Sequence, residues 1–359
     1  MMLYFKPAVF AMKDTYQIFV KTDCRCTMWV KIGDNCYHDD SNGVLRSETT
    51  IHKMIVPMEE LDKARNYTIC GRRIIDRKPY FTETGAIEEY SFSFRPVKKD
   101  SVRFYHMGDV HDYTELALPA AKAYGKMDFL VFNGDILNFC DSIENFNTIY
   151  KISSEIAKGE IPIVFARGNH DMRGRYAEKL SDFTPTDNGN SYYTFRLGSI
   201  WGMVLDCGED KLDSRKEYGN TISCQKFRER ETQFIYDVIE SEEYNAHGIT
   251  QKLIISHNPF FYKPADPTFD IEDDLFNEWC RLLREYIKPT LMLCGHMHAL
   301  HICEPGGSID NRGLPCLAVV GSDIHFDEYY IGCGIEINGK NIEITYTNDK
   351  GEIIEIIKR

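Results

Sequence analysis

Five short motifs between residues 108 and 298 carry the side chains that could do chemistry. They are Gly-Asp-Val-His (108–111), Gly-Asp-Ile-Leu-Asn (134–138), Gly-Asn-His-Asp (168–171), Ser-His-Asn (256–258) and Gly-His-Met-His (295–298). Their oxygen and nitrogen donors suit two divalent metal ions, and the candidate ligands are Asp109, His111, Asp135, Asn169, His257, His296 and His298. Two such ions held close together are typical of sites that hydrolyse phosphate esters. The motifs therefore indicate a metal-dependent phosphoesterase.

The segments between the motifs predict the elements that must position them. Apolar strand-like runs span 102–106, 129–133, 161–166, 253–256 and 291–294, and helix-like segments span 113–124, 146–158, 223–240 and 273–287. This alternation predicts an α/β domain with largely parallel strands. Each motif then follows the carboxyl end of a strand, where ligands gather in open α/β sheets. Strands return at 316–321, 330–337, 341–347 and 352–357, with a tight turn at Asn338-Gly339.

The first 98 residues have a different pattern. Short alternating runs rich in β-branched and aromatic residues span 16–22, 26–32, 49–56, 67–75 and 90–94. This number of strands is typical of a β-sandwich, and residues 96–100 are a plausible linker. We therefore expect an all-β sandwich domain at 1–98, with a fibronectin-III-like pattern, before an α/β domain at 99–359.

Charge and hydropathy exclude some classes of partner. The formal net charge of −13 argues against a nucleic-acid-binding patch, which needs a basic face. No run approaches the roughly 18 apolar residues of a membrane span, and no secretion signal is evident, so we expect a cytoplasmic protein.

Most of the twelve cysteines stand singly in apolar segments, as reduced thiols do. Cys24-Arg-Cys26, with Cys36 and Cys70, is either a zinc site or a set of strand cysteines. The oligomeric state is left open.

Taken together and in this order, the motifs resemble those of the calcineurin-like metallophosphoesterase superfamily. That pattern is Asp-x-His, Gly-Asp-x-x-[Asp/Asn], Gly-Asn-His-[Asp/Glu], a lone His and Gly-His-x-His, and the resemblance covers roughly residues 101–347. It implies a four-layer αββα fold, in which two mixed sheets are flanked by helices. It also implies two ligand sets that share Asp135 as the bridge. One set is Asp109, His111, Asp135 and His298, and the other is Asp135, Asn169, His257 and His296.

The resemblance also implies a mechanism. A hydroxide that bridges the metals attacks phosphorus, and His170 protonates or stabilises the leaving oxygen. Asn138 stands where many relatives have an Asp that orients this histidine, and its amide oxygen can accept a hydrogen bond. Asp171 is a possible substitute for that Asp, or a residue that fixes the loop.

The order of domains also resembles purple acid phosphatases. Two positions depart from that subgroup, which has Gly where this chain has His111 and a tyrosine ligand where it has Asn138. We therefore expect no tyrosinate colour and no fixed requirement for ferric iron. The mixed ligand set suits manganese, iron or zinc.

Substrate specificity is the least determined feature. Arg173 and Arg175 follow the third motif and could grip a phosphate oxygen. The substrate is expected to be a small phosphorylated compound or a phosphodiester, so monoester, diester and pyrophosphate hydrolysis all stay open. A non-catalytic metal-binding scaffold is a further alternative, but such relatives usually lose ligands, and here the ligand set and His170 are intact.

Overall fold

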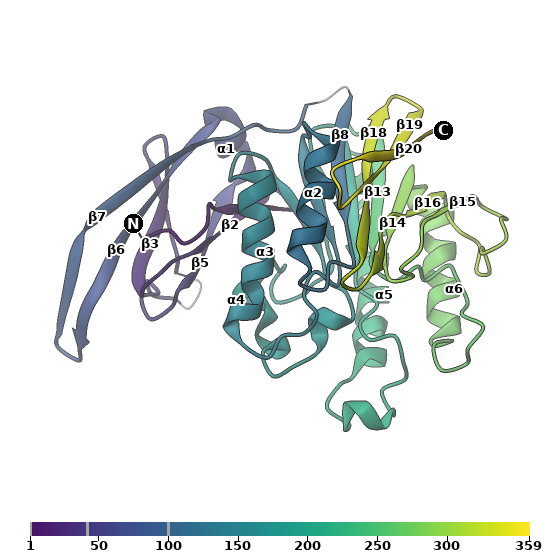
Figure 1. Ribbon diagram of the computed structural model, residues 1–359, viewed down its shortest axis with the longest axis horizontal. Helices are drawn as coiled ribbons and strands as arrows, with labels where there is room; N and C mark the ends of the chain where they lie inside the picture. Colours follow the sequence, from purple (N-terminus) through teal and green to yellow (C-terminus); the bar gives the residue numbers. More distant parts are fainter. Residues whose placement is uncertain (1, 41–42, 99–100) are drawn as a thin grey trace.

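The computed structural model describes residues 2–40, 43–98 and 101–359, and its centre is a pair of packed sheets (Figure 1). The larger sheet has ten strands in the order β20-β19-β18-β8-β9-β10-β1-β2-β5, with β17 paired to β18. Its strands are β20 (Ile353–Lys358), β19 (Asn341–Asn348), β18 (Tyr329–Asn338), β8 (Val102–Met107), β9 (Phe129–Asn133), β10 (Ile163–Ala166), β1 (Ala8–Met12), β2 (Thr15–Lys21), β5 (Ile51–Pro57) and β17 (Asp323–His325).

The second sheet has six strands in the order β11-β12-β13-β14-β16-β15. Its strands are β11 (Tyr193–Leu197), β12 (Ile200–Leu205), β13 (Gln251–Ser256), β14 (Leu291–Cys294), β16 (Leu317–Val320) and β15 (His301–Cys303). Strands β12, β13, β14 and β16 are parallel, as are β8, β9 and β10 in the larger sheet. The expected parallel α/β core is therefore confirmed.

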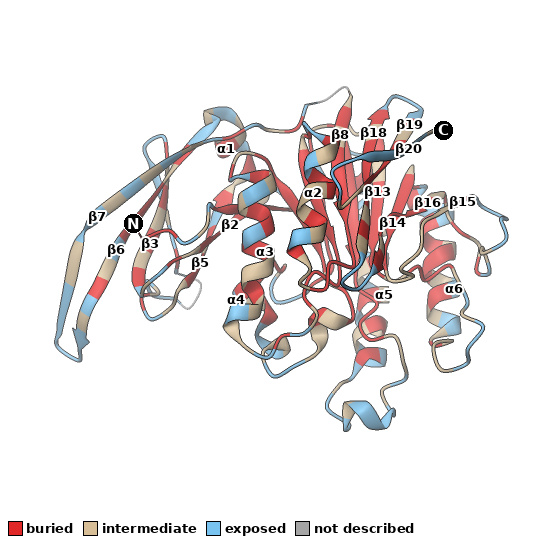
Figure 2. Cartoon of the chain, in the orientation of Figure 1, coloured by how far each residue is buried: buried red, intermediate tan, exposed pale blue. Residues whose placement is uncertain are grey.

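Helices cover the outer face of each sheet and give four layers. Helices α2 (Thr114–Tyr124) and α3 (Asn147–Ile152) share a core with the larger sheet, and α5 (Cys224–Ser241) and α6 (Asp273–Leu282) share one with the smaller. Side chains alternate between layers: Val131 of β9 faces the other sheet, while Leu130 and Phe132 face the helices. Because both faces are covered, the central strands are buried along their length (Figure 2). The αββα expectation is confirmed.

Several short helical segments complete the chain. α3 and α6 each continue as a π-helical turn, at Ser153–Ala157 and Leu283–Ile287, so the expected helices at 146–158 and 273–287 agree with the structure. The remaining helical segments are α1 (Met58–Ala64), α4 (Leu180–Phe183) and the 3₁₀ turns Ile143–Phe146, His170–Met172, Ala177–Lys179, Lys216–Tyr218 and Glu243–Asn245.

The N-terminal segment adds an antiparallel sheet that packs on an extension of the larger one. This four-stranded sheet has the order β4 (Asn35–His38), β3 (Cys26–Ile32), β6 (Asn66–Lys78) and β7 (Phe81–Ser93). Strands β1, β2 and β5 form the opposing layer, and they continue the larger sheet because β1 pairs in parallel with β10, Phe10 opposite Ile163. The domain boundary at residue 98 stays a prediction, and this pairing crosses it. Strands β6 and β7 form a long hairpin arm that extends from the body (Figure 1).

The cysteines are free thiols, and most of them are buried. Cys26 Sγ lies 3.2 Å from His52 Nε2, and burial raises the pKa of this thiol to about 12. Among the described residues, no cluster of metal-ligating side chains includes Cys24, Cys26, Cys36 or Cys70. In the parts of the chain that the structure describes, no helix is both long and apolar enough to cross a membrane.

Candidate metal centre

The five motifs meet at one place, where the carboxyl ends of β8, β9 and β10 face those of β13 and β14 across the two sheets. Three groups of potential ligands lie there, each with its ligand atoms within 4.8 Å of one another. The groups are Asp109, His111 and His298; His111, Asp135 and His170; and Asp135, His257 and His296. His111 and Asp135 each belong to two of the groups, and Asp135 is the residue that connects the His111 side of the cluster to His257 and His296. Asn169, the seventh candidate, joins the cluster through its Oδ1 atom, 3.0 Å from His296 Nδ1.

Five of the seven candidate ligands have left-handed backbone conformations. The φ angles are 52° at Asp109, 47° at His111, 51° at Asp135, 70° at His296 and 47° at His298. This region disfavours residues with a Cβ by roughly 1–2 kcal/mol each. Such strain persists only where the surrounding structure enforces it, and it gathers at functional sites.

Glycines of the motifs let the segments approach closely. A Cβ on Gly134 would collide with the ring of His257, and a Cβ on Gly168 would collide with the Asp135 carboxylate. A Cβ on Gly295 would lie 2.6 Å from Asp109 Oδ2. The glycines are therefore required by contact between motifs as well as by turning of the backbone.

His257 has a ring nitrogen directed at two buried carboxylates. Its Nδ1 donates to the main-chain oxygen of Asn133 at 2.7 Å, which leaves Nε2 at 3.2 Å from Asp135 Oδ2 and 3.7 Å from Asp109 Oδ1. Nε2 is buried and makes no hydrogen bond. Burial lowers the pKa of His257, but Asp135 and Asp109 outweigh it and raise the pKa to about 10. The two carboxylates thus make the surroundings of this nitrogen strongly negative, which favours a proton or a divalent cation there.

His111 and His298 complete the other side of the cluster. Their Nε2 atoms are 3.2 Å apart. His111 Nε2 lies 3.8 Å from Asp135 Oδ2, and His298 Nε2 lies 3.4 Å from Asp109 Oδ1. Two ligands bound about 2.1 Å from one ion lie at most about 4.2 Å apart, so these separations fit a shared ion. The Ser322 hydroxyl and the main-chain N–H of His296 donate to the Asp109 carboxylate and orient it.

His170 lies beside the cluster with both ring nitrogens engaged. Its Nδ1 lies 3.0 Å from the main-chain oxygen of Asn138, and its Nε2 lies 2.7 Å from Arg173 Nη1. Because a main-chain oxygen only accepts, Nδ1 carries the hydrogen. Asn138 therefore orients His170 through its backbone rather than through the amide side chain that the sequence suggested. A backbone acceptor is present whatever residue stands at this position.

Asp171 holds the loops of two motifs together. Its carboxylate accepts hydrogen bonds from the main-chain N–H groups of Asp135, Leu137 and Gly168, at 2.9–3.1 Å. Burial, together with the charge of Asp135, raises the pKa of Asp171. These contacts match the loop-fixing alternative, and its hydrogen bonds go to the backbone rather than to the His170 ring.

The two candidate substrate-binding arginines occupy different places. Arg173 is held by the buried Glu209 carboxylate, with Nε at 2.9 Å from Oε1 and Nη2 at 3.0 Å from Oε2. Arg175 is exposed and lines a neighbouring cavity of about 1090 Å³, together with Arg167 and Arg230. The structure thus brings Arg173 to His170 and leaves Arg175 outside the cavity that the metal-ligand candidates line.

Sequence reasoning did not identify three residues at this site. They are Glu209, Ser322 and Phe326, whose ring lies 5.2 Å from that of His111 and 5.5 Å from that of His298. Ser322 follows a buried strand in Gly-Ser-Asp, which is a signal comparable to those of the five motifs. Glu209 and Phe326 lie in loops and carry no local signal of this kind.

Comparisons with known proteins agree with this geometry. The family model for calcineurin-like phosphoesterases matches residues 102–300, so the chain belongs to that family. It is accordingly a hydrolase that acts on phosphoric ester bonds.

Individual relatives are more distant. The chain is 22% identical over 264 residues to the serine/threonine-protein phosphatases CPPED1 of Homo sapiens and of Pongo abelii, covering 68% of this chain and 78% of each relative. Its fold is similar to that of the purple acid phosphatase PPD1 from yellow lupin, with a TM-score of 0.63 and 13% identity over 99% of this chain and 74% of that one. The structural likeness shows that the fold, including the N-terminal sheets, is shared.

Proposed function

We propose that the chain hydrolyses phosphomonoesters with two divalent metal ions, which are manganese, iron or zinc. One ion is held by Asp109, His111, Asp135 and His298, and the other by Asp135, Asn169, His257 and His296. The observation that carries the proposal is the buried Nε2 of His257, which makes no hydrogen bond and faces Asp135 and Asp109. When bound, the ions supply an activated water nucleophile and neutralise charge on the phosphoryl oxygens.

The chain's own residues then act on the leaving group. Nδ1 of His170 donates to the Asn138 main-chain oxygen, so Nε2 is the nitrogen that can pass a proton to the leaving oxygen, and this step requires that Nε2 be protonated and its contact with Arg173 Nη1 opened. Arg173 adds a positive charge 2.7 Å from this nitrogen, where negative charge develops on the departing oxygen. Asp171 keeps the second and third motifs in register, so that His170 and the ligand carboxylates keep their relative positions.

Monoester hydrolysis is favoured because the curated relatives are named as serine/threonine-protein phosphatases, which act on phosphomonoesters. Diester and pyrophosphate hydrolysis are the alternatives within the same family. The scaffold alternative is disfavoured, because the seven ligand candidates and His170 are all present at one place. The cytoplasmic location stays a prediction.

A paired assay tests this function. Hydrolysis of p-nitrophenyl phosphate and of bis-p-nitrophenyl phosphate is measured with manganese and with chelator, and bound metal is determined in the same samples. We expect metal-dependent turnover of the monoester, and a loss of at least about 100-fold in His170→Ala, as is typical of a missing general acid. Preference for the diester would replace the monoester assignment. Absence of both metal binding and turnover would refute the phosphoesterase function.

A further inference from the structure

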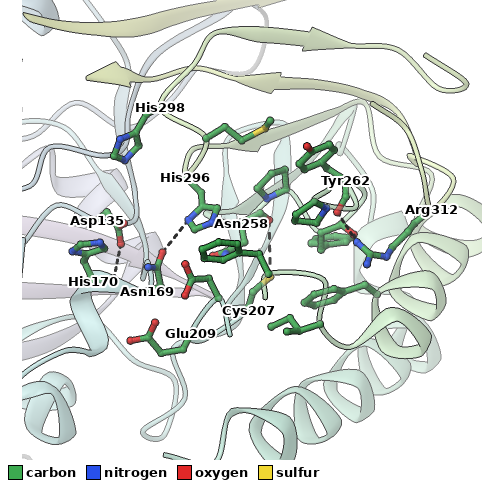
Figure 3. Close-up of a pocket in the computed structure, with 18 residues that line it drawn as sticks. Asp135, Asn169, His170, Cys207, Glu209, Asn258, Tyr262, His296, His298 and Arg312 are labelled. Atoms are coloured by element: carbon green, nitrogen blue, oxygen red, sulfur yellow. Dashed lines mark hydrogen bonds between the residues drawn. The ribbon is translucent and has the colours of Figure 1, made fainter. Parts of the chain in front are cut away.

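A cavity of about 460 Å³ opens directly beside the metal-ligand candidates and continues away from them (Figure 3). Asp135, Asn169, His296 and His298 line one end of it. The same cavity is also lined by apolar side chains, with Tyr262 on the side away from Asp135 and His170 (Figure 3); they are Phe260, Tyr262, Phe269, Ile271, Phe276 and Met297. A phosphoryl group at the metal centre therefore leaves the organic part of its ester next to this apolar chamber. The volume lies within the roughly 300–1,000 Å³ range of small-molecule sites.

The deep wall of the chamber is rigid. Phe260 and Phe276 are buried, and the Phe260 ring packs against the rings of Phe276 at 6.1 Å and Trp279 at 5.4 Å. Tyr262 and Phe269 lie on the loop between β13 and α6 and are only half-buried, so they form the outer wall. The deep part of the chamber is thus a packed apolar surface, whereas its outer wall stands on a loop.

The charges in the chamber are already neutralised by protein groups. Arg312 is the one lysine or arginine among the described residues that line the cavity. Its Nη2 lies 3.0 Å from Asp270 Oδ1 and its Nε lies 2.9 Å from Asp273 Oδ1, and its Nη1 donates to two main-chain oxygens. At the rim, Asp210 pairs with Lys211 at 2.7 Å. A second phosphate or a carboxylate on the substrate would find no free cation here.

We propose that the site selects phosphomonoesters whose alcohol or phenol is an uncharged apolar group that fills this chamber. The inference rests on the proposed function and deepens it. In the reaction, the oxygen of water bonds to phosphorus and the bond from phosphorus to the ester oxygen breaks. The ester oxygen takes a proton, and the products are inorganic phosphate and the free apolar alcohol.

The competing substrate class is one with a polyanionic leaving group. The neighbouring cavity of about 1090 Å³ is lined by Lys211 and by four arginines, including the Arg173 that contacts His170, and it would suit such groups. None of the seven metal-ligand candidates lines it. The apolar chamber is continuous with the metal-ligand candidates, and this continuity favours the apolar class.

A homologous substrate series tests the proposal on the whole 359-residue chain loaded with manganese. The leaving-group pKa changes little from methyl to butyl to hexyl phosphate, whereas the apolar area grows. We expect kcat/KM to rise about threefold to fourfold for each methylene that the chamber buries. A hexyl phosphate with a terminal carboxylate should lose this gain, because the chamber offers no free cation.

Two variants and a binding measurement make the test specific. Phe269→Ala removes part of the outer wall and should reduce the hexyl-to-methyl ratio at least threefold. Tyr286→Ala, which removes an exposed aromatic ring that does not line the cavity, should leave that ratio unchanged. Calorimetric titration with methyl-, butyl- and hexylphosphonate reads the same preference without turnover, and affinity should rise with chain length.

The outcomes separate the two proposals. A length-dependent rise that Phe269→Ala weakens supports the apolar chamber. Equal kcat/KM and equal phosphonate affinity across the series, with p-nitrophenyl phosphate hydrolysed, would overturn the chamber and leave the phosphatase function standing. Length-dependent phosphonate binding with no hydrolysis of any ester would support the chamber and overturn the proposed reaction. Preference for the carboxylated substrate would assign the leaving group to the basic cavity.

Discussion

Arg173 links the buried Glu209 to His170, and removing its guanidinium distinguishes two roles for this residue. A phosphate-gripping arginine would act mainly on substrate binding, whereas the contacts place Nη1 on His170 Nε2 at 2.7 Å. We predict that Arg173→Ala lowers kcat far more than it raises KM. The physical reason is that Arg173 sets the position and charge environment of the histidine that serves the leaving group.

The size of the effect follows from the contacts. A hydrogen bond from a charged group contributes about 1.5–3 kcal/mol, which corresponds to a roughly 10-fold to 150-fold fall in kcat. The variant also leaves the Glu209 carboxylate without its bidentate partner, and among the described residues the Tyr218 hydroxyl, at 3.1 Å, is the hydrogen-bond donor that remains. Breaking a fully buried ion pair costs about 3–5 kcal/mol of stability. A third of the Arg173 side chain is exposed, so water can occupy its place in the variant. We therefore expect the free energy of unfolding to fall by about 1–3 kcal/mol.

Kinetics with p-nitrophenyl phosphate, and thermal unfolding of the same samples, measure both effects. Glu209→Gln provides the matched variant, because it keeps the arginine but weakens the bidentate pair that holds it. We expect it to lower kcat less than Arg173→Ala does. Arg175→Ala, on the neighbouring cavity, is the control and should retain the parent kcat. A raised KM with unchanged kcat in Arg173→Ala would refute the positioning role. It would indicate instead that Arg173 binds the substrate.

Three further predictions concern the metal centre and the buried charges around it. His257→Ala should lose at least one equivalent of bound manganese by elemental analysis, whereas His325→Ala, an exposed histidine, should retain the parent content. Gly168→Ala should lower metal affinity at least tenfold by isothermal titration, since the new Cβ displaces the Asp135 carboxylate; unchanged affinity would contradict the steric argument. Glu231 is buried, and burial raises its pKa in the folded protein well above its usual value. Its contribution to the free energy of unfolding is therefore fully present below about pH 4.5, and it is lost as pH rises through the folded-state pKa. Urea unfolding at pH 5 and pH 9 should therefore show a smaller loss of stability in Glu231→Gln than in the parent protein.

The sequence predicted those parts of the fold that depend on local pattern. Each of the five motif-bearing strands is found where its apolar run stands, because a strand buried on both faces needs a continuous apolar segment. The hairpin between β18 and β19 lies where the turn signal stands, but its two turn residues are Gly339 and Lys340 rather than Asn338 and Gly339, because Asn338 still pairs with Asn341; Gly339 has a φ of 61°. Both features depend on residues that lie close together in the sequence.

Features that depend on distant partners were not predictable in this way. The pairing of β1 with β10 joins segments about 150 residues apart, and nothing in Ala8–Met12 alone indicates that neighbour. Glu209 reaches Arg173 from a loop 36 residues further along the chain. Asn138 was expected to act through its side chain, but its backbone oxygen contacts His170. Because every residue has such an oxygen, the residue type cannot predict this contact. The seven metal-ligand candidates were identified because their chemistry is carried by the side chains themselves.

Strain, close glycine contacts and buried charge all occur at the same few residues. Asp109, Asp135 and Asp171 are buried, and two of their neighbouring glycines approach them so closely that no side chain fits. Burial removes the hydration of these three carboxylates, so positive charge and hydrogen-bond donors beside them stabilise their charged forms. Main-chain N–H groups and His257 supply part of that charge. Of the three, Asp109 and Asp135 also have left-handed backbone conformations, with φ angles of 52° and 51°, and such strain gathers at functional sites, which agrees with their proposed role as metal ligands.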